Sequence, residues 1–357
     1  MPLSHRENYI RNARFQGPEW IPANVSISGA SRVQLREDLE DVMARHPWMY
    51  PGFEKGKIDY DNFQFGNAYR AGEKFVDNWG CTWESSIDGI EGVVMGHPLS
   101  DWSALDTWQP PDPLKVGDRG PVDWDRIRAD VAKAKAAGAL TSGGVPHGFL
   151  FMRLTYLRGF ENALLDMATG EPRMRTLVDM IVDHNMQIVR QYVDMGVDLM
   201  EFGEDLGTQT SSIISPRTFR EWITPGYEKL IAPCAEKDML VALHSDGYIM
   251  DLMDEFRFAG VNIINPQDLC NGIDNLAREV KGQFCIRLDI DRQTVVPFGT
   301  RAEIRELIEE EVRKLGSPQG GLEFICGIYP PTPAENVDAV LEAIKEFRTY
   351  WWDGRGG

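Results

Sequence analysis

From about residue 123 onward, hydrophobic and polar residues follow two different periodic patterns along the chain. Two long segments carry apolar residues at i, i+3, i+4 and i+7 and end at glycine, "DWDRIRADVAKAKAAG" (123–138) and "EPRMRTLVDMIVDHNMQIVRQYVDMG" (171–196). This spacing predicts amphipathic helices with glycine C-caps. Short apolar runs then recur, and they are typical of buried strands. They are "VDLMEFGEDLG" (197–207), "MLVALHSDG" (239–247), "VNIINPQD" (261–268), "FCIRLDIDRQ" (284–293) and "GGLEFICGIYPP" (320–331).

Strands that alternate with helices of a dozen residues or more predict βαβ units with parallel strands. The pattern suits either a doubly wound sheet or a barrel, and no GxGxxG follows any of the strands. The sequence therefore favours an α/β fold of the (β/α)₈ TIM-barrel type. We expect one domain over 1–357, with regular βα units over 121–357. Residues 1–120 are rich in tryptophan and proline and predict an irregular N-terminal embellishment, with short strands around 23–28 and 91–96.

Composition narrows the classes of protein that remain. The formal charge of the 357-residue chain is −18, so a basic face for nucleic acid is not expected. The five cysteines are odd in number and scattered, which argues against a disulfide scaffold and for a reducing compartment. The sequence shows neither a secretory signal nor an apolar run long enough for a membrane span. A soluble cytoplasmic protein is the expectation.

Polar side chains follow each predicted strand, at the end where a barrel of this type carries its active site. These residues are Glu201, Glu204 and Asp205; His244, Ser245 and Asp246; Asn265, Gln267 and Asp268; Asp289 and Asp291; and Cys326 and Tyr329. His97 and His147 lie in loops and could line the same pocket, although most histidines in loops do not.

His244, Cys326 and one carboxylate would make a zinc site, because zinc binds imidazole, thiolate and carboxylate and a catalytic site leaves one position open. The alternative is a buried histidine bonded to a carbonyl and a buried cysteine that packs as an apolar residue. Asp246 could be a ligand, an orienting partner of His244 or a helix N-cap. Glu204 and Asp205 could instead belong to a solvated turn.

Four tryptophans lie close together in the N-terminal region: Trp79, Trp83, Trp102 and Trp108. They could attach an irregular insertion to the barrel, as large aromatic residues often do. They could also form an aromatic wall for a flat ligand, and Trp79 is then a candidate for substrate binding.

Three segments resemble the uroporphyrinogen decarboxylase superfamily: "GEDLGTQTSSIISPRTFREWITPGYEKL" (203–230), "LHSDGYIMDLMDEFRFAGVNIINPQ" (243–267) and "FICGIYPPTPAENVDAVLEAIKEF" (324–347). The resemblance covers about residues 75–350 and implies a (β/α)₈ barrel. The Arg-Gln-Ala-Gly-Arg segment with which true decarboxylases grip substrate carboxylates is absent from "PEWIPANVSISGASRVQL" (18–35). Corrinoid-linked methyltransferases of this superfamily hold zinc with His-x-Cys and a distant Cys. His244 and Cys326 match two of these ligands, and Asp246 stands at the middle cysteine.

The resemblance and this departure together predict a zinc-dependent methyltransferase. A carboxylate ligand in place of a thiolate leaves the metal a stronger Lewis acid, suited to a methyl ether. We expect transfer of a methyl group from a small O-methylated, aromatic methoxy compound to the cobalt of a corrinoid. The corrinoid (cobalamin) would come on a separate carrier protein, because the chain lacks an Asp-x-His-x-x-Gly motif. A homodimer is left open.

The predicted roles follow from these positions. His244, Cys326 and Glu204 are the expected metal ligands, Glu204 and Asp246 the expected catalytic residues, and Asp205, Asn265, Tyr329 and Trp79 the expected substrate contacts. Three alternatives remain: a methylcobamide:thiol methyltransferase, a metal-free decarboxylase that uses Glu204, Asp205 and Asp246 as acids and bases, and a non-catalytic tetrapyrrole-binding protein.

Overall fold

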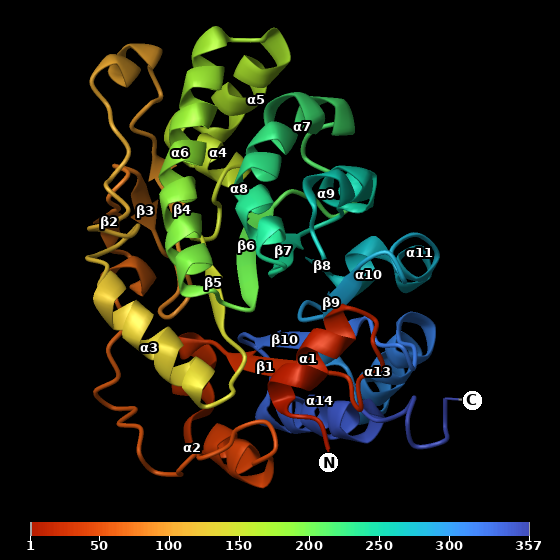
Figure 1. The fold of residues 1–357 in the computed structure, drawn as a ribbon. Coiled ribbons are helices and arrows are strands. Elements are labelled where there is room, and N and C mark those ends of the chain that lie inside the picture. The colour runs from red at the N-terminus through yellow and green to blue at the C-terminus, as the bar shows by residue number, and fades with distance from the viewer. Residues whose placement is uncertain (1, 357) are drawn as a thin grey trace.

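A curled parallel β-sheet forms the centre of the molecule in the computed structural model, which describes residues 2–356 (Figure 1). The seven strands follow the order β1-β10-β9-β8-β7-β6-β5, and every neighbouring pair is parallel. Their bounds are β1 Ala23–Ile27, β5 Ser142–Gly144, β6 Leu199–Asp205, β7 Leu240–Asp246, β8 Ile263–Asn265, β9 Cys285–Asp289 and β10 Leu322–Ile328. The predicted α/β barrel fold is confirmed.

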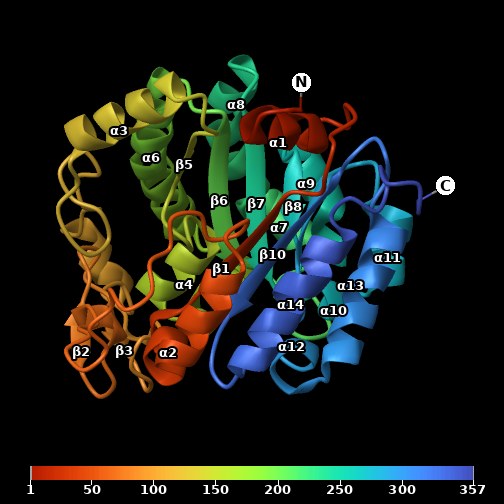
Figure 2. The same cartoon turned by 90° about the horizontal axis from the view of Figure 1, so that it is seen from below.

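Helices cover the outer face of this sheet (Figures 1 and 2). The α-helices are α1 His5–Ala13, α2 Gly29–Arg45, α3 Trp124–Ala136, α4 Phe151–Arg158, α5 Phe160–Thr169, α6 Pro172–Met195, α7 Pro216–Trp222, α8 Thr224–Glu236, α9 Met253–Ala259, α10 Asp268–Asn271, α11 Ile273–Glu279, α12 Val295–Phe298, α13 Arg301–Leu315 and α14 Ala334–Phe347. Short 3₁₀ turns lie at η1 Asn67–Tyr69, η2 Trp102–Asp106 and η3 Met250–Leu252. None of the helices within residues 2–356 combines the length and the apolar character that a membrane span requires.

Capping residues explain where two of the long helices begin and end. A capping box between Thr300 and Glu303 starts α13, and its apolar face packs on α14. Gly196 ends α6 in the left-handed region, with a φ of 63°, which a residue without a Cβ adopts at little cost. Helix α6 therefore stops just before β6, which begins at Leu199.

The barrel has a seam between its two edge strands. β1 and β5 are the ends of the sheet order, and no ladder joins them within residues 2–356. The inward-facing side chains of Asn24, Ser26 and Ser142 along these two strands are exposed. Side chains of both strands nevertheless line one common cavity, so the seam borders the interior of the barrel.

The N-terminal region is more regular than the sequence indicates. Helix α1 lies against the N-terminal end of β10, where the amide of Gly321 donates to the carbonyl of Asn12. β1 and α2 are the first strand and helix of the barrel, so the irregular part begins after α2. It contains a three-stranded antiparallel sheet, β2 Lys74–Val76, β3 Thr82–Glu84 and β4 Val93–Gly96. The short strands predicted around 23–28 and 91–96 are present, and a single domain over 1–357 stays a prediction.

Candidate metal centre

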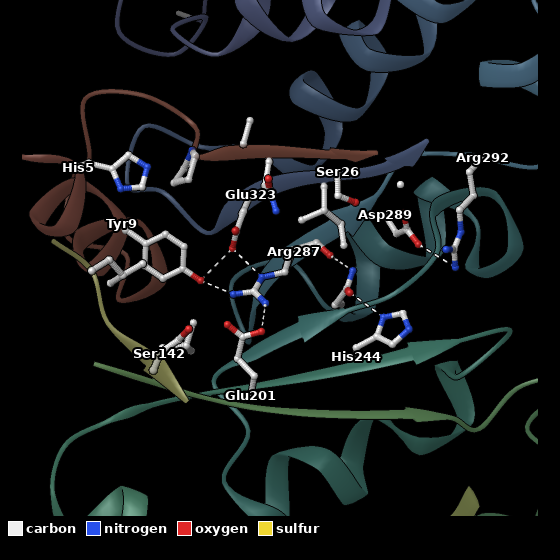
Figure 3. Close-up of a pocket in the computed structure, with 18 of the residues that line it drawn as sticks. His5, Tyr9, Ser26, Ser142, Glu201, His244, Arg287, Asp289, Arg292 and Glu323 are labelled. Atoms are coloured by element: carbon white, nitrogen blue, oxygen red, sulfur yellow. Dashed lines mark hydrogen bonds and ion pairs between the residues drawn. The ribbon is translucent and has the colours of Figure 1, made fainter. Parts of the chain in front are cut away.

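Alternate side chains of the parallel strands line a cavity of about 480 Å³ inside the barrel (Figure 3). The strand period of two residues places Glu201 of β6, His244 of β7, Asn265 of β8 and Arg287 of β9 on this inner face. The ladder between β6 and β7 pairs Gly203 with His244 and Asp205 with Asp246. Residues 203, 205, 244 and 246 therefore belong to the same end of the barrel.

Two histidines and one aspartate converge at this end. The Nε2 of His147, in the loop after β5, lies 3.3 Å from the Oδ1 of Asp205. The Nε2 of His244 lies 3.9 Å from the same oxygen and 3.5 Å from the Oδ1 of Asp246. One potential ligand atom from each of His147, Asp205 and His244 lies within 4.8 Å of the others. This spacing is compatible with three ligands of one metal ion.

A hydrogen bond orients His244 for such a role. Its Nδ1 lies 2.7 Å from the Oδ1 of Asn265, and the Nδ2 of Asn265 in turn donates to the carbonyl of Arg287. The amide orientation makes the Asn265 oxygen an acceptor, so His244 carries its proton on Nδ1. The Nε2 lone pair is then directed toward the carboxylates. Burial lowers the pKa of His244, which favours this neutral form.

The Oδ1 of Asp205 is buried and accepts no hydrogen bond within residues 2–356. Burial alone would raise the pKa of Asp205, but the interaction with His147 outweighs burial and lowers it. Asp205 is therefore an ionised carboxylate with an oxygen that lacks a donor. A buried polar atom of this kind requires a partner, and a cation would supply one.

A second ionic group borders the histidines. The Nη2 of Arg292 lies 2.5 Å from the Oδ1 of Asp246 and 3.3 Å from the Oδ2 of Asp289. The guanidinium also lies over the ring of Tyr329, 5.4 Å from its centroid. Burial raises the pKa of Asp289 to about 7 despite the nearby arginine.

Arg287 occupies the deeper part of the cavity, on the side of α1 (Figure 3). Its Nε donates to Glu323 at 2.9 Å, and its Nη1 lies 3.5 Å from the carboxylate of Glu201. The remaining terminal nitrogen donates to the hydroxyl of Tyr9. These three partners come from two strands and from α1, so Arg287 connects the base of the barrel to its walls.

Comparison with known proteins shows which family this chain belongs to. The sequence pattern of the uroporphyrinogen decarboxylase (URO-D) family matches residues 80–347. The chain belongs to the uroporphyrinogen decarboxylase family. Figure 1 shows that the matched part includes every strand of the barrel except β1.

Relatives within the family have two different activities. The chain is 23% identical to the methylcobamide:CoM methyltransferase MtbA of Methanosarcina acetivorans, over 51% of this chain and 52% of the relative. It is 23% identical to the uroporphyrinogen decarboxylase of Solibacter usitatus, over 72% of each chain. The match thus spans about half the length of the methyltransferase. A methyltransferase from Methanosarcina mazei has a similar fold, with a TM-score of 0.65, 15% identity, and coverage of 96% of this chain and 98% of that one.

Glu204 does not join His244 in this member of the family. It follows Gly203 and precedes Asp205, so strand alternation directs its side chain away from the cavity. The carboxylate is fully buried and accepts hydrogen bonds from the backbone amides of Leu150, Phe151 and Met152, at 2.8, 2.7 and 2.9 Å. Burial raises the pKa of Glu204 to about 7, although these amides lower it. The sequence predicted Glu204 as a metal ligand and catalytic residue. The structure instead gives it the role of a cap for the first turn of α4.

Cys326 is also separated from the histidines. Its neighbours Ile325 and Gly327 line the cavity, so Cys326 faces the helical layer and packs in the main hydrophobic core. The predicted pair of His244 and Cys326 is therefore not brought together by the fold. Burial raises the pKa of the Cys326 thiol well above its ordinary value.

The remaining predicted residues divide between the cavity and the core. Asn265 and Tyr329 line the cavity, and Asp205 and Asp246 adjoin His244. Asp246 is not a helix N-cap, because the 3₁₀ turn that follows is preceded by Ile249. Trp79 is buried elsewhere: its Nε1 donates to Asp118, and the guanidinium of Arg153 lies 4.5 Å from its ring. The tryptophans attach the insertion and do not form a wall of the cavity.

His147 is the residue of this site that was hardest to predict from the sequence. It follows β5, a strand of three small residues, Ser142–Gly144, without an apolar run. Its position would have been evident if "TSGGVPHG" (141–148) had been recognised as a strand end. Burial is the largest single influence on the pKa of His147 and lowers it, but the neighbouring carboxylate of Asp205 raises it overall.

Proposed function

We propose that the protein is a metal-dependent methyltransferase that moves a methyl group from a small O-methylated compound to the cobalt of a corrinoid on a separate protein. The observation that carries this proposal is the convergence of His147, Asp205 and His244 at the active-site end of the barrel. Membership of a family that includes the methylcobamide methyltransferase MtbA supports methyl transfer as the reaction class.

The residues present fit a zinc ion. Two imidazole nitrogens and one carboxylate oxygen form a common ligand set for catalytic zinc, which keeps a fourth position open. Asn265 supplies the outer hydrogen bond that metal-binding histidines usually make. The unpartnered oxygen of Asp205 is the atom that most requires a cation. Zinc held by these residues would supply Lewis acidity toward an ether oxygen.

Neighbouring side chains would orient the substrate. Asp246 and Arg292 border His244, and their ion pair fixes the wall beside the proposed ligands. Asp289 lines the same cavity, and burial raises its pKa to about 7, so a fraction of it is protonated near neutrality. The protonated carboxyl could donate a hydrogen bond to the oxygen from which the methyl group departs.

The ion pairs of the cavity favour methyl transfer over decarboxylation of a polyacidic substrate. Arg287 is bonded to Glu323 and Tyr9 and lies near Glu201, while Arg292 is paired with Asp246 and Asp289. Both cations that line the cavity are thus neutralised by acids of the protein. A substrate with several carboxylates would have to displace these acids, at a large desolvation cost.

The cavity also favours an oxygen substrate over a thiol. No cysteine is among its lining residues in the part of the chain that the structure describes. The proposed ligands are nitrogen and oxygen atoms, and a metal held by them is a harder Lewis acid than a thiolate-bound zinc. We therefore rank the thiol methyltransferase second.

Spectrophotometry with free cob(I)alamin tests this function. The wild-type protein should convert cob(I)alamin to methylcobalamin when a panel of O-methylated compounds is supplied. Asp205→Asn should abolish the conversion, and Cys326→Ala should retain it, because Cys326 faces the core. Decarboxylation of uroporphyrinogen by the wild-type protein, without methyl transfer from any compound, would overturn the proposal.

A further inference from the structure

We infer that the deeper half of the cavity is a hydroxyl-binding chamber, and that the substrate is an O-methylated polyhydroxy compound, such as a methylated sugar or cyclitol. The inference rests on the proposed function and names the substrate class of the same site. Glu201 is its specificity-determining residue, because it is the carboxylate of this chamber with the most exposed side chain.

The strand geometry sets the length of the chamber. Glu201 is two residues before Gly203, which pairs with His244, and four residues before Asp205. Strands rise about 3.3 Å per residue, so Glu201 lies about 7 Å below the level of His244 and about 13 Å below that of Asp205. A substrate with its methoxy group at the proposed metal ligands would thus extend one ring or a short chain toward Glu201.

Uncharged polar groups line the cavity along the seam between β1 and β5. Asn24 and Ser26 of β1 and Ser142 of β5 line the cavity and are exposed along the seam. Within residues 2–356, none of these three side chains makes a hydrogen bond to another protein group. An amide and two hydroxyl groups that are unused by the protein can both donate to and accept from substrate hydroxyls.

The pairing of Glu201 with Arg287 suits hydroxyl groups in particular. Glu323 is buried and bonded to Tyr9 and Arg287, so the carboxylate that a ligand meets is Glu201. The Nη1 of Arg287 donates a long hydrogen bond of 3.5 Å to the carboxylate of Glu201, and Figure 3 shows the two side chains facing each other in the cavity. A hydroxyl group can donate to the carboxylate and accept from the guanidinium without any change in net charge.

The chamber offers little to a flat aromatic ring. The aromatic lining residues other than histidines are Tyr9, at the base, and Tyr329, at the mouth. The other lining residues include the polar Asn24, Ser26, Ser142, Glu201 and Asn265 and the aliphatic Pro22, Ala23, Leu140, Leu199 and Ile325. Trp79 and Trp83 are buried in the insertion instead, where their indole nitrogens donate to Asp118 and Asp77. A methoxyarene ring would cover the polar groups of Asn24, Ser26 and Ser142 without giving them hydrogen-bond partners, which is unfavourable.

Steady-state methyl transfer to cob(I)alamin tests the inference with two panels of donors, mono-O-methyl hexoses and inositols on one side and methoxybenzoates on the other. The wild-type protein should turn over at least one polyhydroxy donor with a kcat/KM about 10-fold or more above every methoxybenzoate. Glu201→Ala should raise the KM for that donor about 10-fold and leave kcat and metal content near wild type. Glu306→Ala, at an exposed glutamate of α13, is the matched control and should change neither parameter.

The outcomes separate the inference from the function on which it rests. A higher kcat/KM with methoxybenzoates than with every polyhydroxy donor would overturn the inference and leave the methyltransferase proposal intact. A KM in Glu201→Ala equal to that of the wild type would overturn the role of Glu201. Absence of methyl transfer from all donors, in protein that contains metal, would overturn the proposed function itself.

Discussion

The Nδ1 of His244 donates to the Oδ1 of Asn265 over 2.7 Å, and the carbonyl of Arg287 holds the Asn265 amide in the orientation that this bond requires. Three consecutive strands, β7, β8 and β9, therefore cooperate to fix the tautomer of one imidazole. Its Nε2 faces Asp205 and Asp246 as a consequence. Outer hydrogen bonds of this kind commonly change metal affinity 10- to 100-fold.

Asn265→Ala should therefore weaken metal binding about 10- to 100-fold, because the imidazole loses its fixed tautomer and orientation. Titration of the zinc-loaded protein with a competing chelator measures the change. Asn24→Ala is a suitable control, since Asn24 lies in the deeper chamber and contacts none of the proposed ligands. An unchanged affinity in Asn265→Ala would show that His244 needs no such support.

Gly203 leaves room for His147. A Cβ on residue 203 would lie 2.8 Å from the Cδ2 of His147, closer than van der Waals contact allows. Gly203→Ala should displace the imidazole and lower metal affinity, with little loss of fold stability because the ring can move toward solvent. Gly120→Ala, where a Cβ would meet no atom within 4 Å, is the matched control. Chelator titration should separate the two variants, and equal affinities would remove His147 from the ligand set.

Glu204 should matter to stability rather than to metal binding. Glu204→Ala leaves three backbone amides at the start of α4, two of them buried, without an acceptor, so we expect a loss of about 2–4 kcal/mol in the free energy of unfolding. Urea denaturation measures this loss, with Glu306→Ala as the surface control. If the Glu204→Ala variant were as stable as the wild type but contained no metal, this expectation would be wrong and Glu204 would be a metal ligand.

Asp289 should make stability depend on pH. Arg292, Asp246, Asp268 and Asp291 are the charged groups that act on its carboxyl, and burial raises its pKa to about 7. The folded protein binds the proton of Asp289 more tightly than the unfolded chain, whose carboxyl has a pKa of about 4. The protonated carboxyl therefore adds its full contribution to the free energy of unfolding below about pH 4, and this contribution is lost as the pH rises through 7.

The free energy of unfolding of the wild type, relative to that of Asp289→Asn, should therefore fall between pH 5 and 7 by on the order of 1 kcal/mol per unit and level off above pH 8. Urea denaturation of both proteins at several pH values measures the difference. A difference that rises with pH over this interval would show that Arg292 keeps Asp289 ionised.

The sequence was sufficient to predict the barrel, because the apolar runs and helical periods after residue 170 correspond to β6–β10 and to their helices. It also identified the strand end that carries His244. It could not assign the inner and outer faces of the strands, because parallel strands are apolar on both sides and their alternation is hidden. Glu204 and Cys326 were consequently placed in the site, whereas each faces outward. His147 follows a strand too short and too small in its side chains to give a pattern.

The metal content of the purified protein, measured by inductively coupled plasma mass spectrometry, tests the central claim most directly. We predict about one zinc per chain in the wild type and in Cys326→Ala. Asp205→Asn and His244→Ala should each retain less than about one tenth of this amount while remaining folded by circular dichroism. Full occupancy in these two variants, or loss of zinc in Cys326→Ala alone, would contradict the account.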